Sequence, residues 1–294
     1  ELGASGIVAV GGGSAMDVAK LIALRVNHHR PMADYDDAKG GDALVTEDVP
    51  PVVALPTTAG TGSEVGRSGV VTLGGHKTVI FSPKLLPALA ILDPALTLSM
   101  PAHITAATGY DALTHNVEAL VAKGDHPLCD SIARGGIELV ARSLVRVMQE
   151  PTDVEARGDM MKSAMMGAIA FQKGLGACHS LAHPLSSHCG LHHGLANALC
   201  LPAVVRFNLE EASTRPAYAE VARIFTGEAD ADAAATVLSK LRSDLGLPSG
   251  LEAAGVTLSD HADLADAAYA DSCHASNPRA CSRDDMARLY EACR

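Results

Sequence analysis

One stretch of the sequence, ACHSLAHPLSSHCGLHHGLAN, is unusually rich in histidine. Five of the 13 histidines in the chain fall between His179 and His193. Neutral imidazole is the commonest protein ligand for transition metals, and it titrates near neutral pH. His179 and His183 are four residues apart, so they would share one face of a helix. We therefore interpret His179, His183 and His193 as parts of a site.

Two residues predict how this stretch bends. Pro184 and Gly190 indicate that a helix kinks or ends before His193, which would then approach from a following turn. The other two histidines, His188 and His192, fit an ordinary role as helix caps or solvated side chains. The stretch thus predicts three convergent imidazoles and two that lie outside the site.

A second pair of polar residues lies in TGYDALTHNVEAL, where Asp111 and His115 are four residues apart. The apolar residues Leu113, Val117 and Leu120 give this segment a helical spacing. Taken alone, the pair fits either a helix-surface contact or half of a metal site. Together with the histidine-rich stretch it completes a set of one aspartate and three histidines.

The composition limits the class of protein. The chain has 294 residues, of which 48% are hydrophobic and 19% are charged, as expected for globular domains with substantial cores. Its formal net charge of −11 argues against nucleic acid or anionic lipid as a partner. Aromatic residues make up only 3%, so base stacking is poorly provided for. No apolar run reaches the ~18 residues that span a bilayer, so we expect no membrane partner.

The seven cysteines indicate a reducing environment. Their number is odd and the sequence contains no CxxC motif, so a reduced, cytoplasmic protein is the simplest interpretation. Cys178 and Cys189 lie within the histidine-rich stretch and are zinc ligands in principle. Four nitrogen and oxygen ligands are already available without them, so we do not assign these thiols to the site.

The first residues predict a nucleotide-binding unit. Residues 6–10 read as a short buried strand, residues 11–14 form the glycine turn GGGS, and a helix follows. Glycines let the backbone approach a phosphate, and the free N–H groups at a helix start favour an anion. The turn is not a GxGxxG fingerprint, because Met16 occupies the last glycine position. A plain strand-to-helix turn remains the alternative.

Further strands are predicted up to about residue 93. Residues 50–55 read as a buried strand, and residues 56–66 form a loop of small hydroxyls and glycines. Residues 70–73 and 78–81 form a hairpin pattern around a two-glycine turn. Residues 88–92 read as one more strand. The first part of the chain is therefore predicted to be α/β.

After Pro101 the spacing of apolar residues becomes helical. Ser282 and Asp285 predict a capping box at the start of the last helix. Three apolar stripes support the helical reading, and their members are Ile137, Val140, Leu144 and Val147; Met161, Met165 and Ile169; and Val237, Leu238, Leu241 and Leu245. We read the methionines as core residues. The predicted domain boundary lies near residue 100, with an α/β domain over residues 1–99 and an all-helical domain over residues 100–294.

Several ordered motifs carry a resemblance to a known family. DALTH, CHSLAHPL and HHGLAN, preceded by GGGSAMDVAK and PTTAGTGSEV and followed by NPR at 277–279, resemble the iron-containing (group III) alcohol dehydrogenase family. The resemblance covers nearly the whole chain. It implies a dehydroquinate synthase-like fold, in which an α/β dinucleotide-binding domain precedes an all-α metal-binding domain and the metal lies in the cleft between them.

The resemblance also implies roles for individual residues. The implied metal ligands are Asp111, His115, His179 and His193, and His183 is similar to the family's histidine near the site, a candidate for proton relay. The implied cofactor-binding residues are Gly12, Gly13, Ser14, Asp17, Thr57, Thr58, Thr61 and Lys77. The implied ion is Fe²⁺, with Zn²⁺ as the alternative, and the implied cofactor is NAD or NADP.

The predicted activity is that of a metal-dependent alcohol dehydrogenase or aldehyde reductase. It would transfer hydride between NAD(P) and a small alcohol or aldehyde, and we expect a homo-oligomer. Three alternatives stay open: a dehydroquinate synthase-like lyase that uses metal and NAD, a metallohydrolase in which the ion activates water, and a catalytically impaired metal-binding fragment. The motifs DALTH and HHGLAN favour the dehydrogenase over the lyase.

The resemblance implies further structure before the glycine turn. In the family, strands and helices precede this point, so we expect two or three βαβ-type units of ~30 residues each to be missing upstream. The acidic residue that selects NAD or NADP would lie there. We expect the exposed flank of the strand at 6–10 to promote association. We also expect weak binding of NAD(H).

Overall fold

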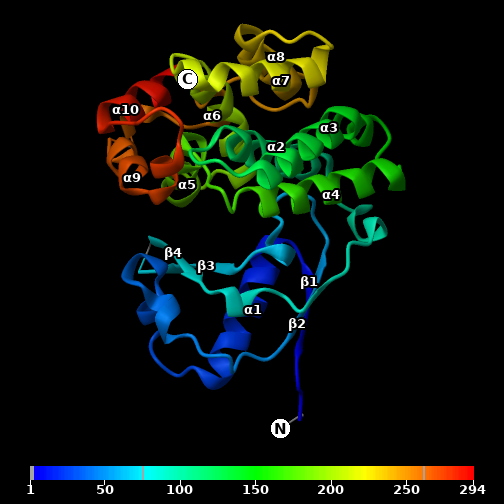
Figure 1. Cartoon of the computed structure of the whole chain (residues 1–294), viewed down its shortest axis with the longest axis vertical. Coiled ribbons are helices and arrows are strands. Elements are labelled where there is room, and N and C mark those ends of the chain that lie inside the picture. Colours follow the sequence, from blue (N-terminus) through cyan, green and yellow to red (C-terminus); the bar gives the residue numbers. More distant parts are fainter. Residues whose placement is uncertain (1–2, 75, 261) are drawn as a thin grey trace.

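The computed structural model describes residues 3–74, 76–260 and 262–294. The chain forms two parts, which lie one above the other in Figure 1. All the strands and the first helix belong to the lower part, and helices α2 to α10 form the upper part. The predicted fold class, α/β followed by a mostly helical domain, is confirmed.

The lower part contains a parallel sheet of three strands in the order β1-β2-β5. These strands are β1 (Ile7–Gly11), β2 (Val52–Pro56) and β5 (Leu89–Ala90). The last of them has two residues, and is therefore shorter than the strand predicted over 88–92. Helix α1 (Gly13–Asn27) covers one face, and the small core between helix and sheet consists of Ala9, Met16, Ala19, Ala23, Val52 and Ala54.

A hairpin packs on the other side of α1. It consists of β3 (Ser68–Leu73) and β4 (His76–Phe81), paired antiparallel as predicted. Gly75, the second glycine of the predicted turn, lies outside the described residues. A second small core joins the hairpin to α1, and it consists of Leu21, Leu24, Tyr35, Val45, Ile80 and Leu85.

The strand β1 is not buried as predicted, because it presents apolar side chains to the surface. Val8 and Val10 are 67% and 56% exposed, and Leu89 of β5 is 53% exposed. Exposed apolar residues that lie close together are typical of interaction surfaces. The association expected of this flank stays a prediction.

The upper part is built around one central helix, α2 (Ala102–Val121), in which every residue from Thr105 to Val121 is buried. A helix that is apolar on most sides must be enclosed by others. The surrounding helices are α3 (Pro127–Gln149), α4 (Val154–Ala170), α5 (Ala177–His188), α6 (His193–Asn208), α7 (Arg215–Thr226), α8 (Ala234–Asp244), α9 (Leu264–Ala270) and α10 (Arg283–Ala292). Within the described chain, no helix is both long enough and apolar enough to cross a membrane.

Several helical predictions are confirmed. The stripe Ile137, Val140, Leu144 and Val147 is fully buried on α3. Ser282 accepts a hydrogen bond from the backbone of Asp285, whose carboxylate accepts one in return, so the predicted capping box opens α10.

The two helices that carry the histidine-rich stretch differ from the prediction in one respect. Helix α5 passes through Pro184 and ends at His188, which is before His193 as expected. His193, however, does not lie in a turn, because it is the first residue of α6. The turn is made earlier, at Gly190, whose φ of +70° belongs to the left-handed region that glycine tolerates. The imidazole of His193 is therefore held at a helix start.

The loop after β2 connects the two parts by close packing. A Cβ atom on Gly60 would lie 2.8 Å from Cβ of Thr108 on α2, and one on Gly62 would lie 2.3 Å from Cβ of Ala168 on α4. Only glycine permits these approaches. The loop predicted to bind cofactor is thus packed against α4 and against α2, which carries two of the predicted metal ligands.

Candidate metal centre

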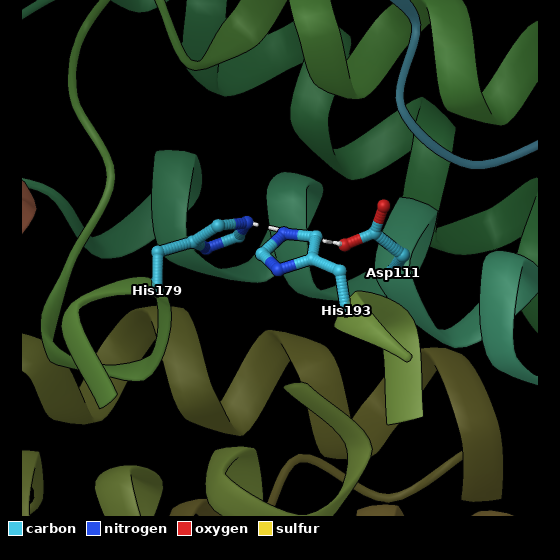
Figure 2. Close-up of side chains that lie close together, drawn as sticks. All are labelled: Asp111, His179 and His193. Carbon is cyan, nitrogen blue, oxygen red and sulfur yellow. Dashed lines mark ion pairs between the residues drawn. The ribbon is translucent and has the colours of Figure 1, made fainter. Parts of the chain in front are cut away.

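Three of the four predicted ligands converge in the interior of the helical part. Figure 2 shows Asp111, His179 and His193 pointing toward one another from three different helices. Oδ1 of Asp111 lies 3.5 Å from Nε2 of His193 and 4.0 Å from Nε2 of His179. One ligand atom from each of the three lies within 4.8 Å of the others. Residues far apart in the sequence therefore form one compact group.

A fourth side chain, the amide of Asn197, points into the same group. Its Nδ2 atom donates to Oδ1 of Asp111 at 2.7 Å and lies 3.3 and 3.4 Å from Nε2 of His193 and His179. Three acceptor atoms thus face one electropositive donor. The same arrangement of lone pairs suits a divalent cation. Asn197 was not predicted from the sequence, although it follows His193 by four residues on α6 and so shares its face.

The fourth predicted ligand, His115, lies beside the compact group and is not a member of it. Its ring stacks on that of His179, with centroids 4.7 Å apart and planes at 20°. Burial lowers its pKa to about 4, against the attraction of Asp111. The ring is therefore neutral at pH 7, which is the form that binds metals.

Two buried ring nitrogens in this region have no hydrogen-bond partner among the described residues. They are Nδ1 of His115 and Nδ1 of His193. Leaving such an atom unpaired costs about 1–3 kcal/mol. The carboxylate and the imidazoles form a nitrogen and oxygen donor set that fits Fe²⁺ or Zn²⁺. The residues present therefore suit the ion that the sequence predicted.

Glu118 fixes the orientation of one imidazole. Its Oε2 atom accepts from Nδ1 of His179 at 2.5 Å, and its Oε1 atom accepts from the backbone N–H of Cys178 at 2.7 Å. Burial opposes a charge on His179, but the attraction of Glu118 outweighs it and raises the pKa. A proton held on Nδ1 leaves the Nε2 lone pair directed at the group. Glu118 was not predicted from the sequence.

The carboxylate of Asp111 stays ionised. Burial raises its pKa, but His115, His193 and His179, together with the hydrogen bond from Asn197, lower it to about 2. The anion is therefore available as a ligand near neutral pH.

The remaining residues of the histidine-rich stretch lie outside the compact group. His188 contacts Asp263 at 3.2 Å, and His192 is the residue before α6. The thiol of Cys178 donates to the backbone oxygen of Asn197 at 3.5 Å. The described group contains neither Cys178 nor Cys189.

His183 lies next to the group but is held by a different carboxylate. Its ring stacks on that of His193, with centroids 5.2 Å apart and planes at 17°. Its Nδ1 atom lies 2.7 Å from Oδ2 of Asp271, and Oδ1 of Asp271 accepts from Ser180 at 2.8 Å. Burial raises the pKa of Asp271, but His183 and its other partners lower it below the ordinary value. No local pattern in the sequence pointed to Asp271, which is distant along the chain.

The residues predicted to bind cofactor meet at the start of α1. The glycine turn and the threonine loop are in direct contact, since a Cβ atom on Gly12 would lie 3.3 Å from the side chain of Thr58. One on Gly13 would lie 2.7 Å from that of Thr61. The threonine loop can therefore approach the backbone of the turn this closely only because the glycines of the turn carry no side chains.

The other residues predicted to bind cofactor have two kinds of position. Some lie at the glycine turn, and one holds the neighbouring loop in place. The N–H of Thr57 donates to Gly11 at 2.8 Å, and Ser14 is exposed in the first turn of α1. Asp17 instead accepts from Ser63 at 2.7 Å, and Ser63 accepts from the buried Lys20 at 2.8 Å. In this structure Asp17 therefore joins α1 to the loop after β2.

Lys77 lies between the two parts. It is exposed on β4, which packs against α5. Desolvation lowers the pKa of Lys77, while the carboxylates of Asp111, Asp271 and Asp17 act to raise it. Lys77 is thus within electrostatic reach of both the metal ligands and the start of α1.

Comparison with known proteins identifies the family. The profile described as the C-terminal part of the Fe-containing alcohol dehydrogenase family matches residues 105–293, and that of iron-containing alcohol dehydrogenase matches residues 1–94. The chain belongs to the iron-containing alcohol dehydrogenase family. The resemblance seen in the sequence is thereby confirmed, and the chain is an oxidoreductase.

Individual relatives cover nearly the whole chain. It is 42% identical to 4-hydroxybutyrate dehydrogenase of Cupriavidus necator, over 99% of this chain and 78% of that protein. It is 36% identical to NAD-dependent methanol dehydrogenase of Bacillus methanolicus, over 97% and 76%. Among solved structures, 1,3-propanediol oxidoreductase superimposes with a TM-score of 0.91 at 36% identity, over 98% and 77%. Sulfoacetaldehyde reductase from Bifidobacterium kashiwanohense, in complex with NAD⁺, gives 0.88 at 35%, over 98% and 76%.

Proposed function

We propose that this protein is a metal-dependent alcohol dehydrogenase or aldehyde reductase that transfers hydride between NAD(P) and a small alcohol or aldehyde. The observation that carries the proposal is the compact group of the buried Asp111 and His179 with the half-buried His193, beside which His183 is oriented by Asp271. Membership of the iron-containing alcohol dehydrogenase family supports it. We assign the cofactor-binding domain to residues 1–99 and the metal-binding domain to residues 100–294.

We assign the divalent ion to Asp111, His115, His179 and His193. The ion supplies Lewis acidity to the substrate oxygen, whether an alcohol or a carbonyl. The ionised Asp111 provides charge compensation, and Glu118 holds His179 in the tautomer that presents Nε2. Carboxylate and imidazole are harder ligands than thiolate, so we propose Fe²⁺ before Zn²⁺.

His183 is the proposed carrier of the reacting proton. Asp271 holds its Nδ1 atom, which leaves Nε2 free to exchange a proton with the substrate oxygen or with water. The side chain of His183 is 28% exposed, whereas that of His179 is 2% exposed. A proton therefore reaches solvent more readily through His183 than through the buried ligand.

The glycine turn and the threonine loop are the proposed cofactor site. The nicotinamide supplies or accepts the hydride. Free N–H groups at the start of α1 suit a pyrophosphate, and in the described chain no side chain caps this helix start. We assign binding to Gly12, Gly13, Ser14, Thr57, Thr58, Thr61 and Lys77, and the support of the loop to Asp17. NAD is the first cofactor to test, because two relatives are named as NAD-dependent or solved with NAD⁺.

The names of the relatives indicate the class of substrate. They are dehydrogenases or reductases of 4-hydroxybutyrate, methanol, 1,3-propanediol and sulfoacetaldehyde. We infer that the substrate of this chain is a small alcohol or the corresponding aldehyde. We also propose a homo-oligomer, and a cytoplasmic location suited to the seven free thiols.

NAD(P)H oxidation in the presence of an aldehyde panel tests the function. Metal-free protein should be inactive, and Fe²⁺ or Zn²⁺ should restore consumption of NAD(P)H in proportion to aldehyde. Asp111→Asn should abolish the response, while the same change at the exposed Asp232 should not. Hydrolysis without cofactor would instead indicate a metallohydrolase. Turnover without net change in NAD(P)H would indicate a lyase.

A further inference from the structure

A second group of possible metal ligands lies beside the first. It consists of His183 on α5 together with Asp271 and Cys273, which flank the start of a short 3₁₀ turn. One ligand atom from each lies within 4.8 Å of the other two. None of these three residues belongs to the group of Asp111, His179 and His193.

The residues of this second group are fixed and accessible. Asp271 accepts from Ser180 at 2.8 Å and from the backbone N–H of Cys273 at 2.9 Å, so its carboxylate is held in place. The side chains of His183 and Asp271 are 28% and 20% exposed. An ion can therefore reach them from solvent without opening the core.

We propose that His183, Asp271 and Cys273 form a second divalent-cation site that prefers Zn²⁺ or another borderline ion to Mg²⁺. One nitrogen, one oxygen and one sulfur ligand leave a fourth position for water, as in three-ligand zinc sites. Tetrahedral zinc separates its ligand atoms by roughly 3–4 Å. The three ligand atoms already lie within 4.8 Å of one another, so only small side-chain movements separate them from this spacing.

Binding at this site releases protons. The thiol of Cys273 must lose its proton to become a ligand, and Nδ1 of His183 must lose the one it shares with Asp271 if that nitrogen binds the ion. Both protons pass to solvent. The two groups also differ in their ligand atoms, because the second offers a thiolate and the first offers only carboxylate and imidazole. Soft and borderline ions should therefore favour the second group more than hard ions do.

The consequence for activity rests on the proposed function. An ion at the second group coordinates a ring nitrogen of His183 and fixes that ring. His183 can then no longer act as the proposed proton carrier. The stacked contact of His183 with His193 places this event directly beside the first group. We infer that excess zinc inhibits the enzyme here, while the first group keeps its own ion.

Cobalt titration of the metal-free full chain tests the second site without measuring activity. We expect two equivalents of Co²⁺ per chain and a near-ultraviolet thiolate-to-cobalt charge-transfer band that grows with only one of them. Cys273→Ser should remove the band and lower the affinity for the second Co²⁺ ion by at least about tenfold. This is the smallest loss usual even for outer partners of a metal ligand. Asp271→Asn should weaken it as well, which keeps the test decisive if the serine variant fails to fold.

Two controls separate this proposal from the assignment of the first site. Cys281→Ser replaces another half-buried thiol, whose Sγ contacts the backbone oxygen of Arg279, and it should keep the band. Asp111→Asn should weaken the other equivalent and also keep the band. The proposal is overturned if Co²⁺ saturates at one equivalent without the band, or if the band survives Cys273→Ser. It is also overturned if the band disappears in Asp111→Asn.

Discussion

Glu118 and His179 form a buried carboxylate–imidazole pair in which Oε2 and Nδ1 are 2.5 Å apart. Both side chains are at most 3% exposed. A proton on Nδ1 is the only arrangement in which His179 both satisfies Glu118 and offers Nε2 to Asp111 and His193. The pair therefore connects α2, which carries Asp111, to α5, which carries His179 and His183.

Glu118→Gln should weaken metal binding by roughly 10–100-fold, the range usual for outer partners of ligands. The amide can still accept a hydrogen bond but no longer provides the charge that stabilises the ligand. Competition with a chelator, followed by metal analysis, measures the change. Glu138→Gln, at an exposed position on α3, is the control and should leave affinity unchanged. Equal affinity in both variants would show that the pair is only structural.

His193→Ala should release most of the metal from the first site and keep most of the fold. An ion held by the remaining ligands exchanges more easily, because each ligand contributes to affinity. His188→Ala removes a histidine that contacts Asp263 instead, and it should retain the ion. Dialysis of both variants against chelator, with circular dichroism as a check on folding, decides the matter. A full equivalent retained by His193→Ala would contradict the assignment.

His183→Ala should keep the ion at the first site and lower turnover by roughly 10²–10⁴-fold, the usual contribution of general acid–base catalysis. Asp271→Asn should shift the pH profile of turnover in the same enzyme, because it changes the partner of Nδ1. Metal content and the pH dependence of kcat are the measurements. Parallel loss of metal and activity in His183→Ala would instead make His183 a ligand.

The sequence predicted those parts of the site in which spacing determines geometry. Asp111 and His115 share a face of α2, as do His179 and His183 on α5, because residues four apart on a helix point the same way. Asp271 could not be found in this way. Its contact with His183 depends on how α5 packs against the 3₁₀ turn after α9, and no local period encodes such packing.

The difference between local spacing and tertiary packing also explains why the length of β5 and the role of Glu118 were not predicted. The strand β5 is shorter than its apolar run, since hydrophobicity alone does not decide how many residues pair. Glu118 follows His115 by three residues and was therefore accessible to the helical rule. It was missed because a glutamate in a helical sequence usually lies at the surface. Only the structure shows that α2 is buried on all sides.

Gly62→Ala should weaken NAD(H) binding while the helical part stays folded. The new Cβ atom would lie 2.3 Å from Cβ of Ala168, so the loop that carries Thr57, Thr58 and Thr61 must move away from α4. Gly40→Ala is the matched control, because its φ of +71° is similar to the +61° of Gly62 and no heavy atom lies within 4 Å of its added Cβ. Both changes cost about 1–2 kcal/mol of backbone strain. Only the first should alter NADH affinity, measured by fluorescence titration.

The buried Lys20 makes stability depend on pH in a predictable direction. It is 1% exposed and donates to Ser63 and to the backbone of Ser68. Burial lowers its pKa to about 8 from 10.5, against the attraction of Asp17 and Glu64. Between these two values the unfolded chain holds a proton that the folded chain has lost. The free energy of unfolding therefore rises with pH across this window, and below pH 8 the effect of pH through Lys20 disappears.

Comparison with Lys20→Met isolates this contribution from that of other titrating groups. Between pH 7.5 and 9.5 the natural chain should gain about 1–2 kcal/mol of unfolding free energy relative to the variant, from a pKa difference of this size. Urea unfolding at the two pH values measures it. Lys162→Met replaces a lysine whose side chain is 60% exposed, and it should behave as the natural chain does. If natural chain and Lys20→Met respond equally to pH, Lys20 keeps its proton in the folded state, and its bonds to Ser63 and Ser68 hold a full charge between α1 and the loop.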